Sequence, residues 1–206
     1  MTLPPDSCEP ATEVIQLPPP RQQATPRREG EAHVPGQLAF ETDPLPLAEV
    51  SDMLWAAWGT RRPGSWGRSA PPMGICQEVT AYVLLPDGAY RYDPQEHQML
   101  LVSPHDLRHC AGHLQSGSYA PLDLVYAVGF CPVCADNDEE HGIAPCADVG
   151  QIVENVSRHC GDAGLASEVH GLVNRSQLVR ALGLTPRQRI ALVQAIGNAS
   201  PRIPAA

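Results

Sequence analysis

The stretch Cys146–Leu165 constrains the fold most, because it combines a helical apolar stripe with a clear end. Val149, Ile152 and Val156 recur at spacings of three and four, which places them on one side of a helix. Gly164 is suited to end that helix. The stretch also carries four polar residues: Asp148, Gln151, Glu154 and Asn155. Buried polar groups need partners, so this helix is expected to have a solvated edge, or to face another subunit or a polar ligand.

Size and charge exclude several classes of protein. The chain has 206 residues and a formal charge of −9, with no dense cluster of lysine and arginine, so nucleic acid and anionic membrane surfaces are not expected partners. No apolar run is long enough to span a membrane. The first residues lack the pattern of a secretory signal. Seven cysteines at irregular spacing do not resemble a secreted disulfide scaffold, so we expect a cytoplasmic protein with mostly reduced thiols.

Proline is concentrated near the N-terminus. Because proline lacks an amide donor and fixes φ, this region cannot be continuous helix or an inner strand. We therefore expect a flexible tail over residues 1–14, a proline-rich extended arm over 15–46, a folded domain over 47–200 and a short tail over 201–206.

The rest of the chain predicts an α+β fold, with a mixed β-sheet flanked by helices. The clearest helix covers residues 45–59, with Pro46 at its start and Gly59 at its end. The apolar run 122–129 is short enough to be a central strand buried on both faces. The remaining predictions are strands at 78–85, 89–92, 99–102 and 189–196, an extended piece at 169–173, helices at 106–114 and 174–182, and a polar loop at 131–145.

One group of cysteines has spacing suited to a metal. Cys131, Cys134, His141 and Cys146 form the pattern C-x2-C-x6-H-x4-C, which supplies the number and kind of ligands for a tetrahedral zinc ion. A redox pair of cysteines, or unrelated free thiols, explains the same pattern equally well. Further candidate ligands are His109, Cys110 and Cys160.

Other residues of catalytic type carry weaker predictions. His97, His105 and His113 are expected at the surface, and the three tryptophans in the core or at an interface. The sequence has no Ser/His/Asp arrangement and no glycine loop for a phosphate, so hydrolase and nucleotidase functions have no support.

Several stretches together resemble the nitroreductase family, and within it a short branch related to the azoline-oxidising, SagB-type dehydrogenases. The helix LPLAEVSDMLWAAWG is followed by GRSAPPMGICQEVTAYV and then by YRYDP. Further on come ADVGQIVENVSRHCGDAGL and VHGLVNR. The matching stretches are residues 15–21, 45–59, 67–83, 90–94, 147–165, 169–175 and 182–197.

This resemblance implies an interlocked homodimer with FMN at the subunit interface. Family members pass hydride between NAD(P)H and nitro, quinone or azoline compounds, and the flavin carries the chemistry while the protein orients it. The family positions carried over to this chain as cofactor-binding residues are Arg68, Gln77, Asn155, Gly171 and Arg202, with Arg61 or Arg62 as further phosphate ligands.

The sequence departs from the family pattern at three places. The slot that usually holds an arginine cluster for the FMN phosphate is residues 34–40 here, and it contains no cation. Pro72 and Ile75 replace a serine and an asparagine of the flavin loop, and Glu154 replaces a neutral amide. Two functions therefore remain open. The first is an FMN-dependent oxidoreductase, and the alternative is a dimeric binding or structural protein that has lost FMN, with a Cys/His metal site.

Overall fold

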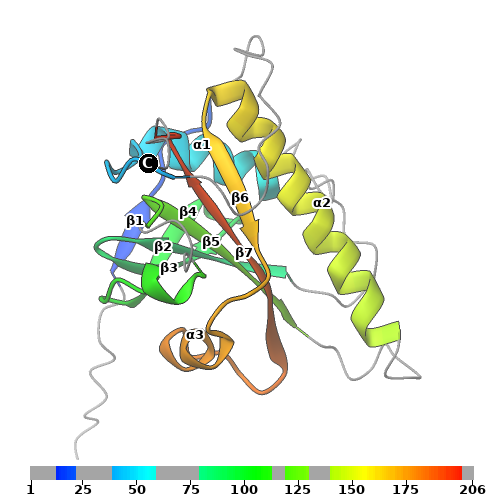
Figure 1. Cartoon of the computed structure of the whole chain (residues 1–206). Helices are drawn as coiled ribbons and strands as arrows, with labels where there is room; N and C mark the ends of the chain where they lie inside the picture. Colours follow the sequence, from blue (N-terminus) through cyan, green and yellow to red (C-terminus); the bar gives the residue numbers. More distant parts are fainter. Residues whose placement is uncertain (1–12, 22–38, 59–78, 113–118, 130–139, 201–206) are drawn as a thin grey trace, which may run out of the picture.

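A computed structural model of the chain describes residues 13–21, 39–58, 79–112, 119–129 and 140–200 (Figure 1). Seven strands form one sheet in the order β1-β4-β3-β2-β5-β7-β6. The strands are β1 Val14–Gln16, β2 Val79–Leu85, β3 Gly88–Asp93, β4 Gln98–Ser103, β5 Leu122–Gly129, β6 Ala166–His170 and β7 Gln188–Gly197. The predicted α+β class is confirmed.

Every pairing between these seven strands is antiparallel, so the sheet is more uniform than the mixed sheet expected from the sequence. Short turns join β2 to β3 and β3 to β4, and a short connection can only return the chain antiparallel.

Helices cover both faces of the sheet (Figure 1). Helices α1, Leu47–Trp58, and α2, Glu140–Ala163, pack on one face and on each other, where they bury the larger hydrophobic core. Helix α3, Arg175–Ala181, and the 3₁₀ turn η1, Arg108–Cys110, pack on the other face over a second core. The sheet is therefore the middle layer of three.

The helix predicted at Cys146–Leu165 exists, but it begins earlier, at Glu140. Val149, Ile152 and Val156 are buried against the core as the spacing predicted. Gln151 and Glu154 lie on the exposed side. The last part of the polar loop predicted at 131–145, residues 140–145, is thus helical and belongs to α2. Gly164 follows the helix with φ +79, a left-handed conformation typical of a helix end.

The predicted helix at 106–114 is wrong within the described residues. Only the three-residue turn η1 forms, and Gly112 follows it with φ +101. A Cβ at Gly112 would lie 2.5 Å from the carbonyl oxygen of Leu172, so the chain needs glycine there. The predicted start of the next helix is confirmed, since the Asn174 side chain accepts a hydrogen bond from the Gln177 amide and caps α3.

The two ends of the described domain meet beside β7. Phe40 forms an isolated antiparallel bridge with Ala199, and Glu41 donates its amide to the carbonyl of Asn198. A Cβ at Gly197 would lie 2.5 Å from the Pro121 side chain. The close approach therefore requires glycine at the end of β7.

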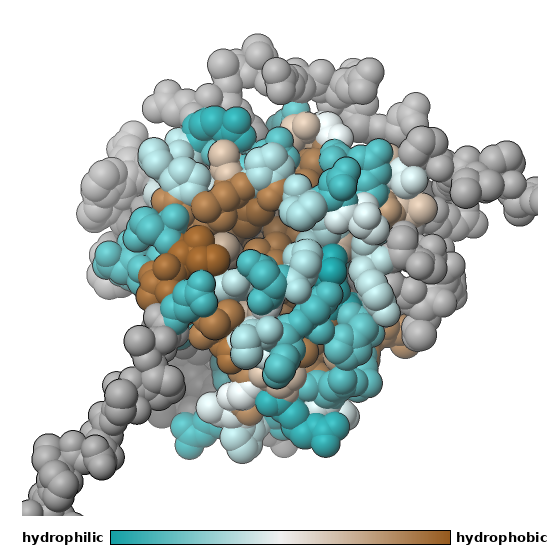
Figure 2. All heavy atoms as spheres, turned by 90° about the vertical axis from the view of Figure 1, so that its left-hand side faces the viewer, coloured by the Kyte–Doolittle hydropathy of each residue, from teal (hydrophilic) through white to brown (hydrophobic). Residues whose placement is uncertain are grey.

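The side of the molecule that carries β1 and β4 exposes apolar side chains among hydrophilic ones (Figure 2). Val14 on β1 pairs with Leu100 on β4, and Val102 lies two residues further along the same face. Val14 and Val102 are 48% and 37% exposed.

Candidate functional site

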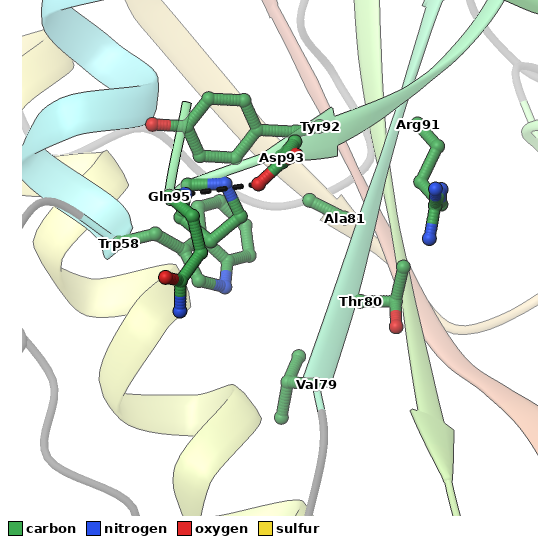
Figure 3. Close-up of a pocket in the computed structure, with 9 residues that line it drawn as sticks. Trp58, Val79, Thr80, Ala81, Arg91, Tyr92, Asp93 and Gln95 are labelled. Carbon is green, nitrogen blue, oxygen red and sulfur yellow. Dashed lines mark hydrogen bonds between the residues drawn. The ribbon is translucent and has the colours of Figure 1, made fainter. Parts of the chain in front are cut away.

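A pocket of about 240 Å³ lies where α1 ends and β2 begins (Figure 3). Its lining comes from the last residue of α1, the first residues of β2, and the end of β3 with the turn that follows. The lining residues are Trp58, Val79, Thr80, Ala81, Arg91, Tyr92, Asp93, Pro94 and Gln95. Residues 59–78, which contain the predicted flavin loop, connect Trp58 to Val79, so that segment leaves from and returns to this pocket.

Aromatic rings build one wall of the pocket. The Trp58 indole stacks on Tyr126 with ring centroids 5.8 Å apart and meets Tyr92 edge to face at 6.0 Å. All three rings belong to the core between the sheet and the two long helices. Packed aromatic rings have little rotamer freedom, so this wall is rigid.

A buried polar network holds Tyr126 in place. The Tyr126 hydroxyl donates to Gln194 Oε1, and Gln194 Nε2 donates to Ser157 Oγ at 3.0 Å. Gln194 is fully buried on β7, and Ser157 lies on α2. The network therefore links strands β5 and β7 to helix α2, which contains the helix predicted at Cys146–Leu165.

A second network holds Tyr92, the other ring of the wall. The Tyr92 hydroxyl lies 2.9 Å from His97 Nδ1, and Ser51 Oγ lies 2.8 Å from His97 Nε2. Ser51 also donates to the carbonyl of Pro18 at 2.6 Å. Trp55 packs edge to face on the imidazole at 5.3 Å. The expectation that His97 lies at the surface is wrong, because these contacts from α1, β3 and the N-terminal segment half-bury it.

The donors and acceptors fix the tautomer of His97. The single Ser51 hydroxyl proton goes to the Pro18 carbonyl, so Ser51 Oγ accepts from His97 Nε2–H, and Nδ1 accepts from Tyr92. This assignment corresponds to the neutral imidazole, the form that burial favours. Burial lowers the pKa of His97, opposed by the Pro18 carbonyl and the Asp52 carboxylate. Ser51 is fully buried and its proton is occupied, so the Ser51–His97 pair is not a nucleophile and base.

The residues Leu17–Arg21 form a strap, called the N-terminal strap below, that lies along α1. Arg21 donates from its amide and from Nε to the two Asp52 oxygens, each at 2.7 Å. Together with the Pro18–Ser51 bond, this pair fixes the strap on α1. The strap belongs to the proline-rich arm predicted at 15–46, of which residues 15–21 and 39–46 are described.

The predicted cofactor residues are described only in part. Arg68, Gln77 and Arg202, together with the alternatives Arg61 and Arg62, lie outside the described residues. Asn155 is half-buried on α2, and its Oδ1 accepts from Arg158 at 2.9 Å. Gly171 is exposed just after β6, and an added Cβ would meet no atom within 4 Å.

Sequence reasoning missed Arg158, although its spacing of three from Asn155 on a predicted helix could have shown it. It also missed Tyr92 and Arg91. The YRYDP stretch was recognised as a point of resemblance, but the fact that its side chains line a pocket depends on the β2–β3 register.

The side chains of the predicted metal site are not among the described residues. Cys131 and Cys134 lie outside them, and His141 and Cys146 occupy helical positions of α2. Within the described residues, no group of three or more His, Cys, Asp or Glu side chains is arranged to hold a metal.

Cys110 and Cys160 are free and buried. Cys110 lies in the core under α3 and Cys160 in the core under α2, on opposite sides of the sheet. Burial raises the pKa of the Cys160 thiol to about 12 and raises that of Cys110 as well. Because they lie in separate cores on opposite faces of the sheet, these two cysteines cannot ligate the same ion.

The described residues fit part of a flavin site. The pocket offers a rigid aromatic wall and one exposed cation, Arg91. Its volume lies below the range of roughly 300–1,000 Å³ typical of small-molecule sites. A whole FMN would therefore need further residues, from the segment that starts and ends at the pocket or from a second copy of the chain.

Comparison with known proteins identifies the family. The chain matches the nitroreductase family over residues 39–198. It belongs to the nitroreductase family. A nitroreductase-type protein from Ralstonia eutropha JMP134 is 33% identical, with a TM-score of 0.80 over 92% of this chain and 90% of the other. No curated protein matches the chain.

Two more distant structures share the fold. The Escherichia coli microcin synthetase McbBCD, a complex with truncated pro-MccB17 bound, matches with a TM-score of 0.71 and 16% identity over 83% of this chain and 71% of the other. An oxidoreductase containing FMN matches with a TM-score of 0.53 and 13% identity over 87% of this chain and 84% of the other. The predicted resemblance to the nitroreductase family is confirmed, and these two distant structures share its fold.

No helix among the described residues is both long enough and apolar enough to cross a membrane.

Proposed function

We propose that this protein is an FMN-dependent oxidoreductase of the nitroreductase type. It would act as a cytoplasmic homodimer that transfers hydride between NAD(P)H and a small organic acceptor, or oxidises a heterocycle. The proposal rests on the pocket lined by Trp58 and Val79. The surrounding chain matches the nitroreductase family over residues 39–198. FMN, when bound, supplies the redox chemistry, and the protein supplies position and environment.

The residues proposed to hold FMN are Arg68, Gln77, Asn155, Gly171 and Arg202, with Arg61 or Arg62 as additional phosphate ligands. Arg158 places a cation beside Asn155, because its guanidinium donates to the Asn155 amide oxygen at 2.9 Å. That bond fixes the orientation of the amide. The Trp58 and Tyr92 rings exclude water from one side of the pocket.

Purified protein should show the visible absorbance of bound flavin, or acquire it when FMN is added. Gly171→Ala should weaken FMN binding at least tenfold if the cofactor approaches the backbone there. Because the added Cβ meets no protein atom, the substitution should leave the melting temperature unchanged. Gly161→Ala on α2, also in open space, is the matched control and should bind FMN normally.

The alternative is a nitroreductase-fold protein without FMN. The lack of any cation in residues 34–40, where relatives hold the phosphate, favours it. Such a protein would be a dimeric binding or structural protein, with Cys131, Cys134, His141 and Cys146 as a metal site. Metal analysis of the same sample separates the two. Zinc without flavin uptake supports the alternative, and bound FMN without metal supports the oxidoreductase.

A further inference from the structure

The Asp52 carboxylate holds the Arg21 end of the N-terminal strap on α1. Its oxygens accept hydrogen bonds from the Arg21 amide and from Arg21 Nε, each at 2.7 Å. The Asp52 side chain is 8% exposed, whereas that of Arg21 is 64% exposed. The residues between Leu17 and Arg21 are all proline and have no amide hydrogen to donate. Loss of the contact with Asp52 would therefore free this end of the strap.

The same carboxylate acts on two histidines. His159, on α2, is 6% exposed, and His97 is half-buried in the turn between β3 and β4. Burial lowers the pKa of both imidazoles, and the Asp52 carboxylate opposes this effect without outweighing it. Both histidines are therefore neutral at pH 7.5, and Arg21 is the cation that Asp52 holds there.

The charges around His159 make the strap and a proton compete. After burial, which lowers the pKa of His159 most, the Asp52 and Asp162 carboxylates raise that pKa and the Arg21 guanidinium lowers it. Departure of Arg21 would remove its positive charge and leave the Asp52 carboxylate to the imidazole. A state that binds a proton more tightly is favoured as the pH falls, so protonation of His159 favours the released strap.

His97 holds the other end of the strap and responds differently. Its Nε2 lies 3.2 Å from the Pro18 carbonyl oxygen and 2.8 Å from Ser51 Oγ, and its Nδ1 lies 2.9 Å from the Tyr92 hydroxyl. A protonated imidazole donates from both nitrogens, and these oxygens can accept from it. Protonation of His97 therefore retains the contact with Pro18.

We propose that the Asp52 carboxylate, shared between Arg21 of the strap and His159 of α2, is an acid-sensitive latch. At neutral pH it holds Arg21, and it pairs with the imidazolium when His159 takes up a proton. Arg21 is the partner that leaves, because its exposed guanidinium is readily hydrated whereas a buried charge needs a partner. The Pro18 end of the strap stays in place. None of these residues lines the pocket, so the latch operates whether or not FMN is bound.

Hydrogen exchange of the Arg21 amide tests the latch directly, because this amide donates to Asp52. In the full-length protein, lowering the pH from 7.5 to 5.5 should reduce its protection factor about tenfold. This is the effect of one group with an ordinary pKa of about 6.5 that takes up its proton on release. The Arg21 amide should exchange faster than the amides of β5 at both pH values, which identifies a local opening. An unchanged protection factor at Arg21 overturns the proposal.

A pair of histidine variants identifies the group that takes up the proton. In His159→Gln the Arg21 amide should be equally protected at pH 7.5 and pH 5.5. His105→Gln, at an exposed site after β4, is the matched control and should behave as wild type. If His159→Gln shows the full wild-type loss of protection, His159 does not operate the latch and the proposal is wrong.

The reciprocal measurement changes a surface residue and leaves the core intact. Because linkage acts in both directions, Arg21→Gln should raise the pKa of His159, followed by NMR titration of its imidazole. Arg180→Gln, an exposed arginine on α3, should leave that titration unchanged. The latch is ruled out if His159 titrates in Arg21→Gln as it does in the wild type.

Discussion

At the scale of single residues, protonation of His97 makes the stability of the folded protein depend on pH, and His97 contacts the pocket residue Tyr92. Its neutral form donates to Ser51 and accepts from Tyr92, and burial lowers its pKa. As pH falls, the unfolded chain therefore takes up the proton before the folded protein does. The stability associated with neutral His97 is complete above the ordinary pKa of about 6.5 and is lost progressively below it.

We expect His97→Gln to reduce the pH dependence of unfolding between pH 7.5 and pH 5.5, measured by urea titration at both values. The variant should be less stable at pH 7.5, because Tyr92 and Ser51 lose part of their hydrogen bonding. Some pH dependence should remain, since burial also lowers the pKa of His159. His105→Gln, at an exposed site after β4, is the control; an identical slope in His97→Gln and wild type would contradict the assignment.

The buried Gln194 is the second residue whose role follows from its contacts. Gln194→Leu fills similar volume but leaves the Tyr126 hydroxyl and Ser157 without this partner. The expected cost is about 1–3 kcal/mol of unfolding free energy. The double variant with Tyr126→Phe should cost less than the sum of the two single changes. Strict additivity in the denaturation midpoints would show that the two side chains do not act together.

At the same scale, the sequence could not have predicted these polar networks. Periodicity identified the buried sides of α2 and β5, because each depends on local spacing. The bonds from Tyr92 to His97 and from Tyr126 to Gln194 join residues whose proximity depends on strand order and register. His97 was misjudged for this reason: it lies in a polar turn of the sequence, yet α1 and the N-terminal strap close over it.

At the scale of elements, the strands and long helices were predictable, and the short pieces were not. The strand Leu122–Gly129 was predicted to the residue, because a continuous apolar run bounded by turns has few other solutions. The 3₁₀ turn η1 was taken for a helix, because three or four suitable residues do not distinguish a single turn from a longer helix. The end of the β2–β3 ladder at the pair Tyr82–Arg91 depends on two strand ends, which are the least certain features of any sequence-based assignment.

The N-terminal strap gives a prediction for an element. Ser51→Ala removes the donor to the Pro18 carbonyl and the acceptor for His97, while the Arg21–Asp52 pair remains. The variant should lose about 1–3 kcal/mol of stability, and residues 13–21 should exchange amide hydrogens faster than the rest of the sheet. Ser176→Ala, exposed on α3, should change neither. Uniform acceleration throughout the protein would indicate global destabilisation instead of release of the strap.

At the scale of the whole molecule, we expect the homodimer typical of the family. Leu172 is the exposed side chain whose burial by a second subunit would contribute most to the free energy of dimerisation. Leu172 is 86% exposed, next to the proposed cofactor residue Gly171. Val169, on the edge strand β6, is 42% exposed nearby in the sequence. Burial of a leucine side chain contributes about 1.5–3 kcal/mol. In a twofold dimer each such contact occurs twice, so an exposed leucine at the interface has a large effect on assembly.

We therefore expect wild-type protein to migrate as a dimer of two 22.1 kDa chains in size-exclusion chromatography with light scattering. Leu172→Asp should weaken the dimer at least a hundredfold, because two buried leucines are replaced by two carboxylates that would lose their hydration. Val102→Asp, an exposed apolar position on β4, should leave the dimer intact. If Leu172→Asp dimerises as tightly as wild type, this loop is not part of the interface. If wild type is a monomer at micromolar concentration, the proposed flavin site cannot be shared between subunits.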